Sequence, residues 1–237
     1  IKRRVKMKIA IIGDLHGKNC WKKLFKDKID SLDKIIFMGD YSDDSWITFT
    51  DKEIVSNLKE VIDFKKKYNE KVELLIGNHD FQYIVGYPTA GRYRKTYAKE
   101  MHQIFKENEK LFKIIFIKNN CIFSHAGITN GWIDFIKKKY NIKNITINNL
   151  EEEVNKVYAS DKEDCNIVSF RRGGFNNFAG LLWADTEDLI EDAWINYNQI
   201  VGHNRVKPYA VIKRKNYNIF LSDHFDTNQD ILLEIDI

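Results

Sequence analysis

The sequence predicts an α/β protein, and two observations support this prediction. Short apolar runs that end at a glycine or a polar turn recur along the chain, and they alternate with longer segments whose apolar residues follow a helical spacing. Short runs rich in β-branched side chains favour buried strands. Apolar residues at intervals of three and four favour helices with one buried face.

The expected elements follow in chain order. Four strands are predicted from the short apolar runs at residues 9–12, 35–38, 72–76 and 122–123. A helix between the second and third strands is predicted from the spacing of Ile54, Val55, Leu58, Val61 and Ile62. A helix after the third strand is predicted from Ala98, Met101, Ile104, Phe105, Leu111 and Phe112. A weaker helix is expected at residues 150–158, and two further strands at 219–221 and 231–233.

Length and composition indicate a single domain over residues 1–237. The chain is 43% apolar, which is enough for a sizeable core, and it contains no internal repeat or low-complexity linker. No stretch approaches the roughly 18 consecutive apolar residues of a membrane span, so we expect no membrane partner.

Charge and cysteine usage bound the partners and the compartment. The formal net charge of +4 is mild, and the lysine runs at 65–67 and 137–139 are interpreted as solvated helix ends that complement the helix dipole. Nucleic acid stays open as a partner but is not favoured. We expect no signal peptide before Met7. A cytoplasmic location is also expected, because the cysteines lack metal or disulfide spacing: Cys20, Cys121 and Cys165.

Five short motifs carry residues that can bind metal ions. In chain order they are Gly13-Asp14-Leu15-His16-Gly17, Gly39-Asp40-Tyr41-Ser42-Asp43, Gly77-Asn78-His79-Asp80, Ser124-His125-Ala126-Gly127 and Gly202-His203. Four of them directly follow a predicted strand, and open α/β sheets place their sites at the carboxyl ends of strands. Any one motif alone is typical of a turn or of a hydrogen-bonded core residue. The complete set is hard to produce by chance and indicates a metal site.

The candidate ligands combine hard oxygen atoms with imidazoles and include no thiolate: Asp14, His16, Asp40, Asn78, His125 and His203. Such a donor set suits Mn, Fe or Zn. Six candidates exceed the needs of one tetrahedral ion, but two ions about 3.5–4 Å apart that share a carboxylate would use them all. Such a pair performs hydrolysis, because it lowers the pKa of a bound water and neutralises charge on a transferring phosphoryl group.

The motif series resembles that of the calcineurin-like metallophosphoesterases, and most closely their phosphoprotein phosphatase branch with its bacterial and phage relatives. The segment Gly180-Leu181-Leu182-Trp183-Ala184-Asp185 is similar to the Leu-Trp-Ser-Asp segment of that branch. The resemblance extends over residues 8–206. It implies a four-layer αββα fold, in which two mixed β-sheets pack as a sandwich flanked by helices.

The resemblance also implies a role for each candidate residue. One metal ion would be bound by Asp14, His16 and Asp40. The second would share Asp40, and its other ligands would be Asn78, His125 and His203. His79 would be the general acid at the leaving oxygen, oriented by Asp43, while a metal-activated water attacks directly. We expect two divalent ions, with manganese first and Fe, Zn, Ni or Mg as alternatives.

Two positions depart from the family pattern. Asp44 stands where the phosphatase branch has a phosphate-gripping arginine, so another cation must take over if phosphate is bound in the same way. Arg171 and Arg172 are candidates, because an arginine fork can bind two phosphate oxygens; an ordinary polar loop is the alternative. Arg205 replaces a second histidine that many phosphodiesterases of the superfamily carry. It is a third candidate for phosphate, with solvent contact as the alternative.

An aromatic and basic segment at residues 81–97 follows the third motif. It would stack a base or hold a peptide beside the metals, or its aromatic side chains would close the core over the sheet edge. The second interpretation is slightly favoured, because aromatic residues are so often buried.

The motifs leave three hypotheses for the function. The first is a phosphomonoesterase that acts on phosphoprotein, nucleotide or small phosphate esters. The second is a phosphodiesterase or dinucleoside polyphosphate hydrolase, and the third is a non-catalytic scaffold, as in a retromer subunit related to the superfamily. The intact ligand set and His79 argue against the scaffold, and the missing second histidine at Arg205 favours monoesters. The sequence leaves the natural substrate and the oligomeric state open.

Overall fold

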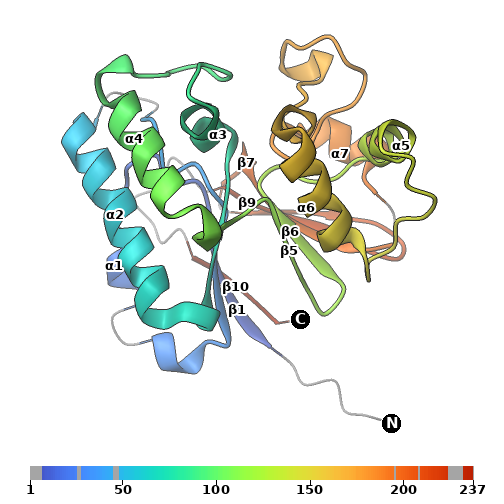
Figure 1. Ribbon diagram of the computed structural model, residues 1–237. Coiled ribbons are helices and arrows are strands. Elements are labelled where there is room, and N and C mark those ends of the chain that lie inside the picture. The colour runs from blue at the N-terminus through green and yellow to red at the C-terminus, as the bar shows by residue number, and fades with distance from the viewer. Residues whose placement is uncertain are drawn as a thin grey trace.

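Two mixed β-sheets form the centre of the protein (Figure 1). The computed structural model describes residues 7–25, 28–44, 48–194, 196–207, 209–223 and 232–236. Within these residues each sheet has five strands. The four-layer sandwich predicted from the sequence is confirmed.

The first sheet has the order β10-β1-β2-β3-β4, in which β1 to β4 are parallel and β10 is antiparallel to β1. Its strands are β1 (Lys8–Ile12), β2 (Lys34–Phe37), β3 (Val72–Leu75), β4 (Phe112–Lys113) and β10 (Leu232–Asp236). Because the parallel strands run in one direction, their carboxyl ends meet at one edge of the sheet. The loops that carry the first three motifs begin at this edge.

The second sheet has the order β5-β6-β7-β9-β8, with β6, β7 and β9 parallel and the two outer strands antiparallel to their neighbours. Its strands are β5 (Ile115–Lys118), β6 (Cys121–Ser124), β7 (Asn198–Arg205), β8 (Ala210–Lys213) and β9 (Asn218–Asp223). The strand predicted at 219–221 is confirmed as part of β9. The strand predicted at 231–233 is confirmed as part of β10, with Ile231 outside the described residues.

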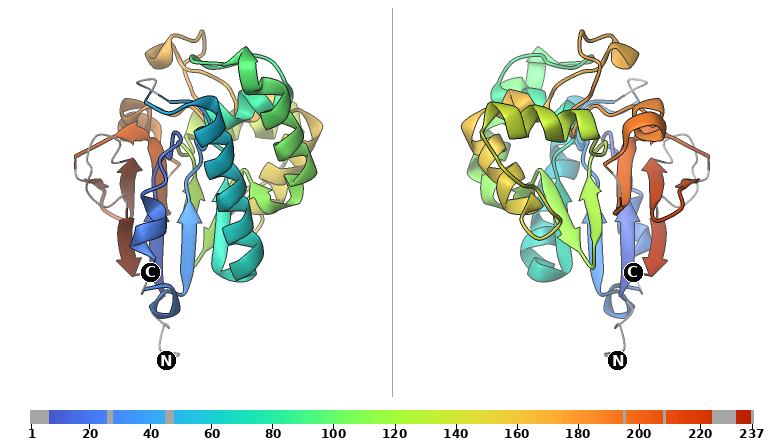
Figure 2. Two further views of the ribbon diagram at one scale, coloured as in Figure 1. Left: turned by 90° about the vertical axis from the view of Figure 1, so that its left-hand side faces the viewer. Right: turned by 90° about the vertical axis from the view of Figure 1, so that its right-hand side faces the viewer.

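Helices cover the outer side of each sheet (Figure 2). The first sheet is covered by helices that include α2, which packs on β3, and the second by helices that include α6, which packs on β5. The helices are α1 (Trp21–Leu24), α2 (Asp51–Tyr68), α3 (Asn78–Val85), α4 (Lys95–Glu107), α5 (Asn130–Lys139), α6 (Leu150–Ser160) and α7 (Thr186–Asp192).

Burial on both faces explains why the strand sequences are continuously apolar. Along β1, Ile9 and Ile11 contact the cluster between the two sheets, whereas Ala10 and Ile12 contact the cluster beneath the helices. All four side chains are fully buried. A strand buried on both faces has no solvent side that would require polar residues, so apolar and polar residues do not alternate along it.

The helix predicted from Ile54 to Ile62 is confirmed as α2. Thr50 and Glu53 form a capping box at its start, and the predicted apolar positions are buried. Its lysine run behaves differently from the prediction at one position. Lys65 is buried, and its ammonium group donates hydrogen bonds to the carbonyl oxygens of Asn69 and Val72 instead of being solvated.

The prediction for the next helix was wrong at its end. Helix α4 stops at Glu107, and Phe112 belongs to strand β4. Asn108 ends the helix, because its backbone N–H and its side-chain amide both donate to the carbonyl oxygen of Ile104. Periodicity continued past this point only because Leu111 and Phe112 are also buried or half-buried.

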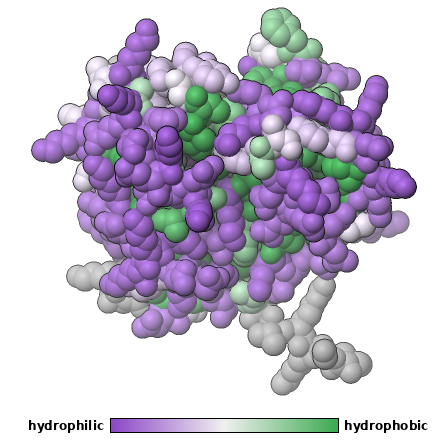
Figure 3. Space-filling model, viewed as in Figure 1, coloured by the Kyte–Doolittle hydropathy of each residue, from purple (hydrophilic) through white to green (hydrophobic). Residues whose placement is uncertain are grey.

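The surface seen in Figure 3 is mainly hydrophilic, with apolar side chains gathered between the α4 side and the α6 side. A small cavity of about 130 Å³ lies between these helices, with Phe105 and Tyr158 among its lining residues. Among the described residues, no helix combines the length and the apolar character needed to span a membrane.

Candidate metal centre

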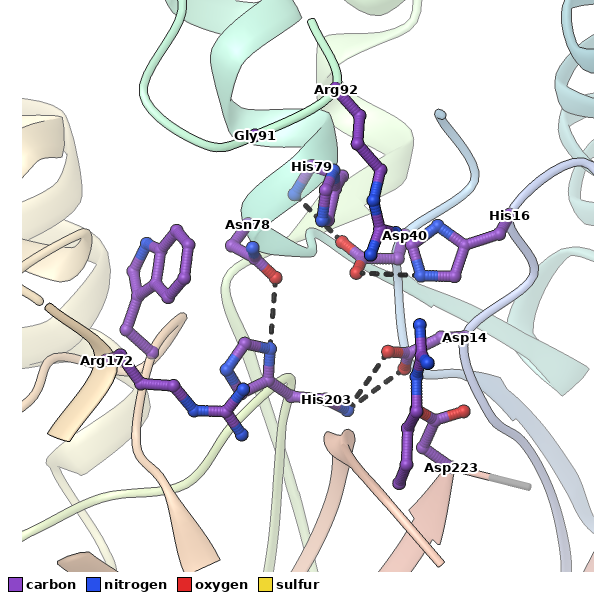
Figure 4. Close-up of a pocket in the computed structure, with 12 residues that line it drawn as sticks. Asp14, His16, Asp40, Asn78, His79, Gly91, Arg92, Arg172, His203 and Asp223 are labelled. Atoms are coloured by element: carbon purple, nitrogen blue, oxygen red, sulfur yellow. Dashed lines mark hydrogen bonds and ion pairs between the residues drawn. The ribbon is translucent and has the colours of Figure 1, made fainter. Parts of the chain in front are cut away.

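The motif residues meet in one pocket of about 430 Å³ at the carboxyl ends of the strands (Figure 4). The loops after β1, β2 and β3 approach it from the first sheet, and β7 and β9 end beside it from the second sheet. The pocket is lined by Asp14, His16, Asp40, Asn78, His79, Gly91, Arg92, Arg172, Trp183, His203, Arg205 and Asp223. His125 is fully buried directly behind this wall.

Asp40 occupies the centre of the cluster. One carboxylate oxygen, Oδ1, accepts the backbone N–H of His79 at 2.9 Å. The other, Oδ2, lies 3.5 Å from Nε2 of His16 and 3.6 Å from Nε2 of His125. One oxygen of Asp40 is therefore close to two imidazoles that come from different sheets, as a carboxylate shared by two ions requires.

Backbone carbonyls fix the orientation of two imidazoles. Nδ1–H of His125 donates to the carbonyl oxygen of Met38 at 2.7 Å, and Nδ1–H of His16 donates to that of Asp43 at 3.0 Å. A carbonyl oxygen can only accept, so each ring carries its proton on Nδ1. Nε2 of each ring, which faces Asp40, therefore keeps its lone pair for a metal ion.

Asn78 joins the remaining candidate ligands. It is the first residue of α3, and its Oδ1 lies 2.9 Å from Nε2 of His125 and 3.1 Å from Nδ1 of His203. Nε2 of His203 is buried and has no hydrogen-bond partner within the described part of the chain. A buried polar atom without a partner is unusual, and a metal ion would satisfy it.

Glycines allow these loops to approach one another. A Cβ atom on Gly77 would overlap Oδ1 of Asp40, and one on Gly202 would lie 2.5 Å from Oδ1 of Asp14. Each of these glycines precedes one candidate ligand and packs against another. The Gly-Asn and Gly-His pairs of the sequence are therefore explained by close approach of the backbone to a carboxylate.

Four residues of the site hold a left-handed backbone conformation: His16, Asp40, Asp43 and His203, with φ between 45° and 59°. This conformation is uncommon outside glycine and costs on the order of 1–3 kcal/mol per residue. Strain of this kind persists where the surrounding structure holds it, and it is concentrated at functional sites.

Three carboxylates crowd the pocket. Asp14, Asp40 and Asp223 are all buried. Burial raises the pKa of Asp14 well above its ordinary value, and Asp223 and Asp40 raise it further. Burial likewise raises the pKa of Asp223 to about 7. A divalent cation would offset both the burial and the repulsion of these groups.

The imidazoles are suited to bind such a cation. Burial lowers the pKa of His16 to about 3 and also lowers the pKa of His125 and His203. All three are therefore neutral at physiological pH, the form that ligates a metal. Donor atoms of Asp14, Asp40 and His125 lie within 4.8 Å of one another. The donor set fits divalent metal ions.

The comparison with known protein families agrees with this geometry. A family model described as calcineurin-like phosphoesterase matches residues 7–226, which is most of the chain. The chain belongs to the calcineurin-like phosphoesterase family. It is a metal-dependent phosphoric ester hydrolase, and the family predicted from the motif series is confirmed.

Solved structures resemble this phosphoesterase at low sequence identity. The I115M mutant of a cold-active protein tyrosine phosphatase is 16% identical with a TM-score of 0.51, and the match covers 90% of this chain and 70% of that one. A metallophosphoesterase from Sphaerobacter thermophilus is 18% identical with a TM-score of 0.33, and 54% of each chain is covered. The first likeness shows the fold alone. No curated protein matches the chain.

His79 lies beside the candidate metal ligands of this phosphoesterase and contacts Asp43. Nδ1 of His79 is 3.0 Å from Oδ2 of Asp43, the partner expected from the sequence. Burial lowers the pKa of His79, but Asp40 and the hydrogen bond with Asp43 outweigh burial and leave the pKa above its ordinary value. The ring is thereby favoured as a proton donor.

Asp44 does not line the pocket. Its carboxylate accepts hydrogen bonds from the backbone N–H groups of Thr48 and Phe49, where the chain turns into α2. The carboxylate at this position therefore binds the backbone just before α2 and does not face substrate in the pocket.

The two consecutive arginines of the predicted pair take different directions. They lie in the short 3-10 turn η5 (Phe170–Arg172). Arg171 forms ion pairs with acidic residues of α7 and does not line the pocket. Arg172 lines the pocket, where Asp185 and Asn204 hold its guanidinium at 2.6 and 2.8 Å. Arg205 also lines it.

Sequence reasoning did not assign two charged residues that line the pocket, Arg92 and Asp223. Arg92 belongs to the aromatic and basic segment that follows the third motif, for which binding and packing interpretations were both open. Asp223 is the last residue of β9, so the rule that placed polar residues after strands also applied to it. Asp223 was missed because the strand was predicted only at residues 219–221, which excludes the residue at its end.

Proposed function

We propose that this phosphoesterase is a phosphomonoesterase that uses two divalent metal ions, with manganese as the expected metal, and direct attack of an activated water. The observation that carries the proposal is the position of Asp40, whose Oδ2 is 3.5 and 3.6 Å from imidazoles that follow strands of different sheets. The two ions, when bound, supply a nucleophilic water at neutral pH and neutralise charge on the phosphoryl group.

The ligands divide between the two sheets in this proposal. Asp14, His16 and Asp40 bind the first ion. The second shares Asp40 and is bound by residues from α3, from the loop after β6 and from β7: Asn78, His125 and His203. Support comes from the neutral imidazoles and from the contacts of Asn78 Oδ1 with both histidines of the second group.

His79 donates the proton to the leaving oxygen. Asp43 orients the ring through Nδ1, so Nε2 is the atom available to the leaving group. Asp43 itself is buried and accepts hydrogen bonds from the hydroxyl groups of Tyr83 and Tyr97. These hydrogen bonds hold the carboxylate that orients His79 in place.

The arginines around the pocket favour monoesters over phosphodiesters, the first of the two alternatives; a dinucleoside polyphosphate is itself highly anionic and is distinguished by the substrate panel. Arg92, Arg172 and Arg205 line the same cavity as the carboxylates. A monoester carries up to two negative charges on its phosphate, whereas a diester carries one. The substrate is a phosphoprotein, a nucleotide or a small ester, and a phosphotyrosine peptide belongs in the test panel because one structural neighbour is a protein tyrosine phosphatase.

A metal-reconstituted substrate panel tests this function. It contains p-nitrophenyl phosphate, a nucleoside monophosphate, a phosphotyrosine peptide, bis(p-nitrophenyl) phosphate and a dinucleoside polyphosphate. We expect the highest kcat/KM among the monoesters. A preference for the diester or the polyphosphate would replace the proposal by its alternative, and no turnover of any substrate with bound metal would support a scaffold.

We expect two metal ions per chain after reconstitution with manganese. Elemental analysis of the desalted protein measures the stoichiometry, and thermal unfolding gives an independent readout, because a ligand at 100 times its Kd stabilises the fold by about 2.7 kcal/mol. His16→Ala should lose one equivalent, since His16 serves only the first ion. One ion or none in the unaltered protein at saturating manganese would contradict the dinuclear centre.

Arg172 and Arg171 form a matched pair for a test of phosphate binding. Arg172→Ala should weaken transition-state binding by about 2–3 kcal/mol, the scale of a charged hydrogen bond, and kcat/KM should fall accordingly. Arg171→Ala removes the same charge from the neighbouring position, whose side chain pairs with α7, and should leave kcat/KM nearly unchanged. Unchanged kcat/KM in both variants would show that neither arginine binds phosphate.

A further inference from the structure

The loop between α3 and α4 reaches over the metal centre. It begins at Gly86, which ends α3 in a left-handed conformation, and it ends where α4 begins at Lys95. Gly91 and Arg92 of this loop line the pocket together with Asp40 and His79. Figure 4 shows the Arg92 side chain extending from the loop towards Asp40 and His79.

Hydrogen bonds hold the loop in this position. The Gln82 side chain accepts the backbone N–H of Ala90 at 3.3 Å, and the Tyr83 hydroxyl accepts that of Arg94 at 3.0 Å. The Arg94 guanidinium in turn donates to Asp51 at 2.9 Å, at the start of α2. The loop is thus fixed on both sides of Arg92.

These anchors converge on the carboxylate that orients His79. Gln82 donates to Oδ2 of Asp43, and the Tyr83 hydroxyl donates to Oδ1. Asp43 therefore positions both the proposed general acid and the loop that carries Arg92.

The backbone at Arg92 has a φ of 69°, which is unfavourable for an arginine. The residue is exposed. Strain at an exposed pocket residue, held by a network of hydrogen bonds, indicates a functional constraint on its side chain.

We propose that Arg92 binds the substrate phosphate and makes the site selective for dianionic monoesters. This inference rests on the proposed function. Asp44 stands at the position where the phosphatase branch has an arginine, and its carboxylate accepts a backbone hydrogen bond outside the pocket. Arg92 supplies a guanidinium to the pocket from a different segment.

Arg92 and Arg172 belong to separate loops, on opposite sides of the pocket in Figure 4. A phosphate bound between them would offer its non-bridging oxygens to both forks. A monoester dianion has charge and oxygen atoms for two guanidinium groups as well as the metals. In a diester one more phosphate oxygen is esterified and the negative charge is lower by one. A diester therefore gains less from the second arginine.

The test uses the metal-reconstituted protein and Arg92→Met, which removes the guanidinium and its charge but keeps an unbranched side chain. We expect kcat/KM for p-nitrophenyl phosphate to fall about 10- to 100-fold, the scale of a lost charge-assisted hydrogen bond. The loss for bis(p-nitrophenyl) phosphate should be clearly smaller. The affinity for inorganic phosphate, measured by calorimetry, should weaken by a factor similar to that for the monoester. Arg92→Lys should recover part of the affinity.

Lys95→Met is the matched control, because it removes a positive charge from an exposed residue only three positions away. It should leave phosphate affinity unchanged. Unchanged phosphate affinity in Arg92→Met, or equal losses on the monoester and the diester, would overturn the assignment. Phosphate binding without turnover in the unaltered protein would contradict the proposed function instead. The assignment of Arg92 would still be decided by the binding measurement.

Discussion

Asp40→Asn should reduce turnover of phosphate monoesters by about a thousandfold or more, because loss of a shared ligand disturbs both ions and each contributes several kcal/mol of transition-state stabilisation. Oδ2 of Asp40 is the atom that approaches imidazoles of both halves of the site. The measurement is kcat for p-nitrophenyl phosphate at saturating manganese, with metal content determined on the same sample.

Asparagine is a suitable replacement, since it tolerates the left-handed conformation that Asp40 adopts at φ 52°. The matched comparison is Asp14→Asn, which removes one carboxylate charge from the same cluster but affects a ligand of one ion only. We expect the Asp40 variant to be the more damaged of the two. Near-normal turnover of Asp40→Asn would show that the assignment of the shared ligand is wrong.

His79→Asn should retain both metal ions and slow hydrolysis by the roughly 10²–10⁴-fold typical of a lost general acid. The side chain of His79 faces Asp43 and the pocket, while its backbone N–H donates a hydrogen bond to the central Asp40. That backbone contact survives the substitution. Elemental analysis and steady-state kinetics on an alkyl phosphate measure the two parts of this prediction.

The leaving group distinguishes proton donation from phosphate binding at His79. An alkoxide needs the proton, so the loss should be largest for an alkyl phosphate. p-Nitrophenolate departs readily without one, so the loss should be smaller for p-nitrophenyl phosphate. Equal losses on both substrates with intact metal content would mean that His79 binds phosphate or shapes the site.

Several strands and most of the candidate ligands were predictable because their signals are local. A buried strand is recognised from a few adjacent residues, and a glycine followed by a polar residue marks the turn at its end. Asp14, Asp40 and Asn78 follow parallel strands of one sheet, so the strand-end rule brings them to the same edge. His203 was placed by its motif alone, since it lies within β7 at a register shift.

Elements without such local signals were not predicted. Strands β5 and β8 are antiparallel members of the second sheet, where pairing with β6 and β9 decides the conformation. Helix α3 begins at Asn78 itself, because Asp80 accepts the backbone N–H of Gly77 and caps the first turn. The sequence signal at this point was interpreted as a ligand motif, and its helical start was not recognised.

The sequence alone determined the chemistry of the site, namely the carboxylates, imidazoles and amide that fit a metal-dependent hydrolase. Only the tertiary structure decided which cations face that site. Arg171 and Arg172 are adjacent in the chain, but a 3-10 turn rotates successive side chains by about a third of a turn, so one faces α7 and the other the pocket. Arg92 reaches the pocket because Gln82 and Tyr83 connect its loop to Asp43. These two residues lie 39 and 40 positions after Asp43 in the chain. Contacts of this kind depend on how distant segments pack, and no pattern of neighbouring residues encodes them.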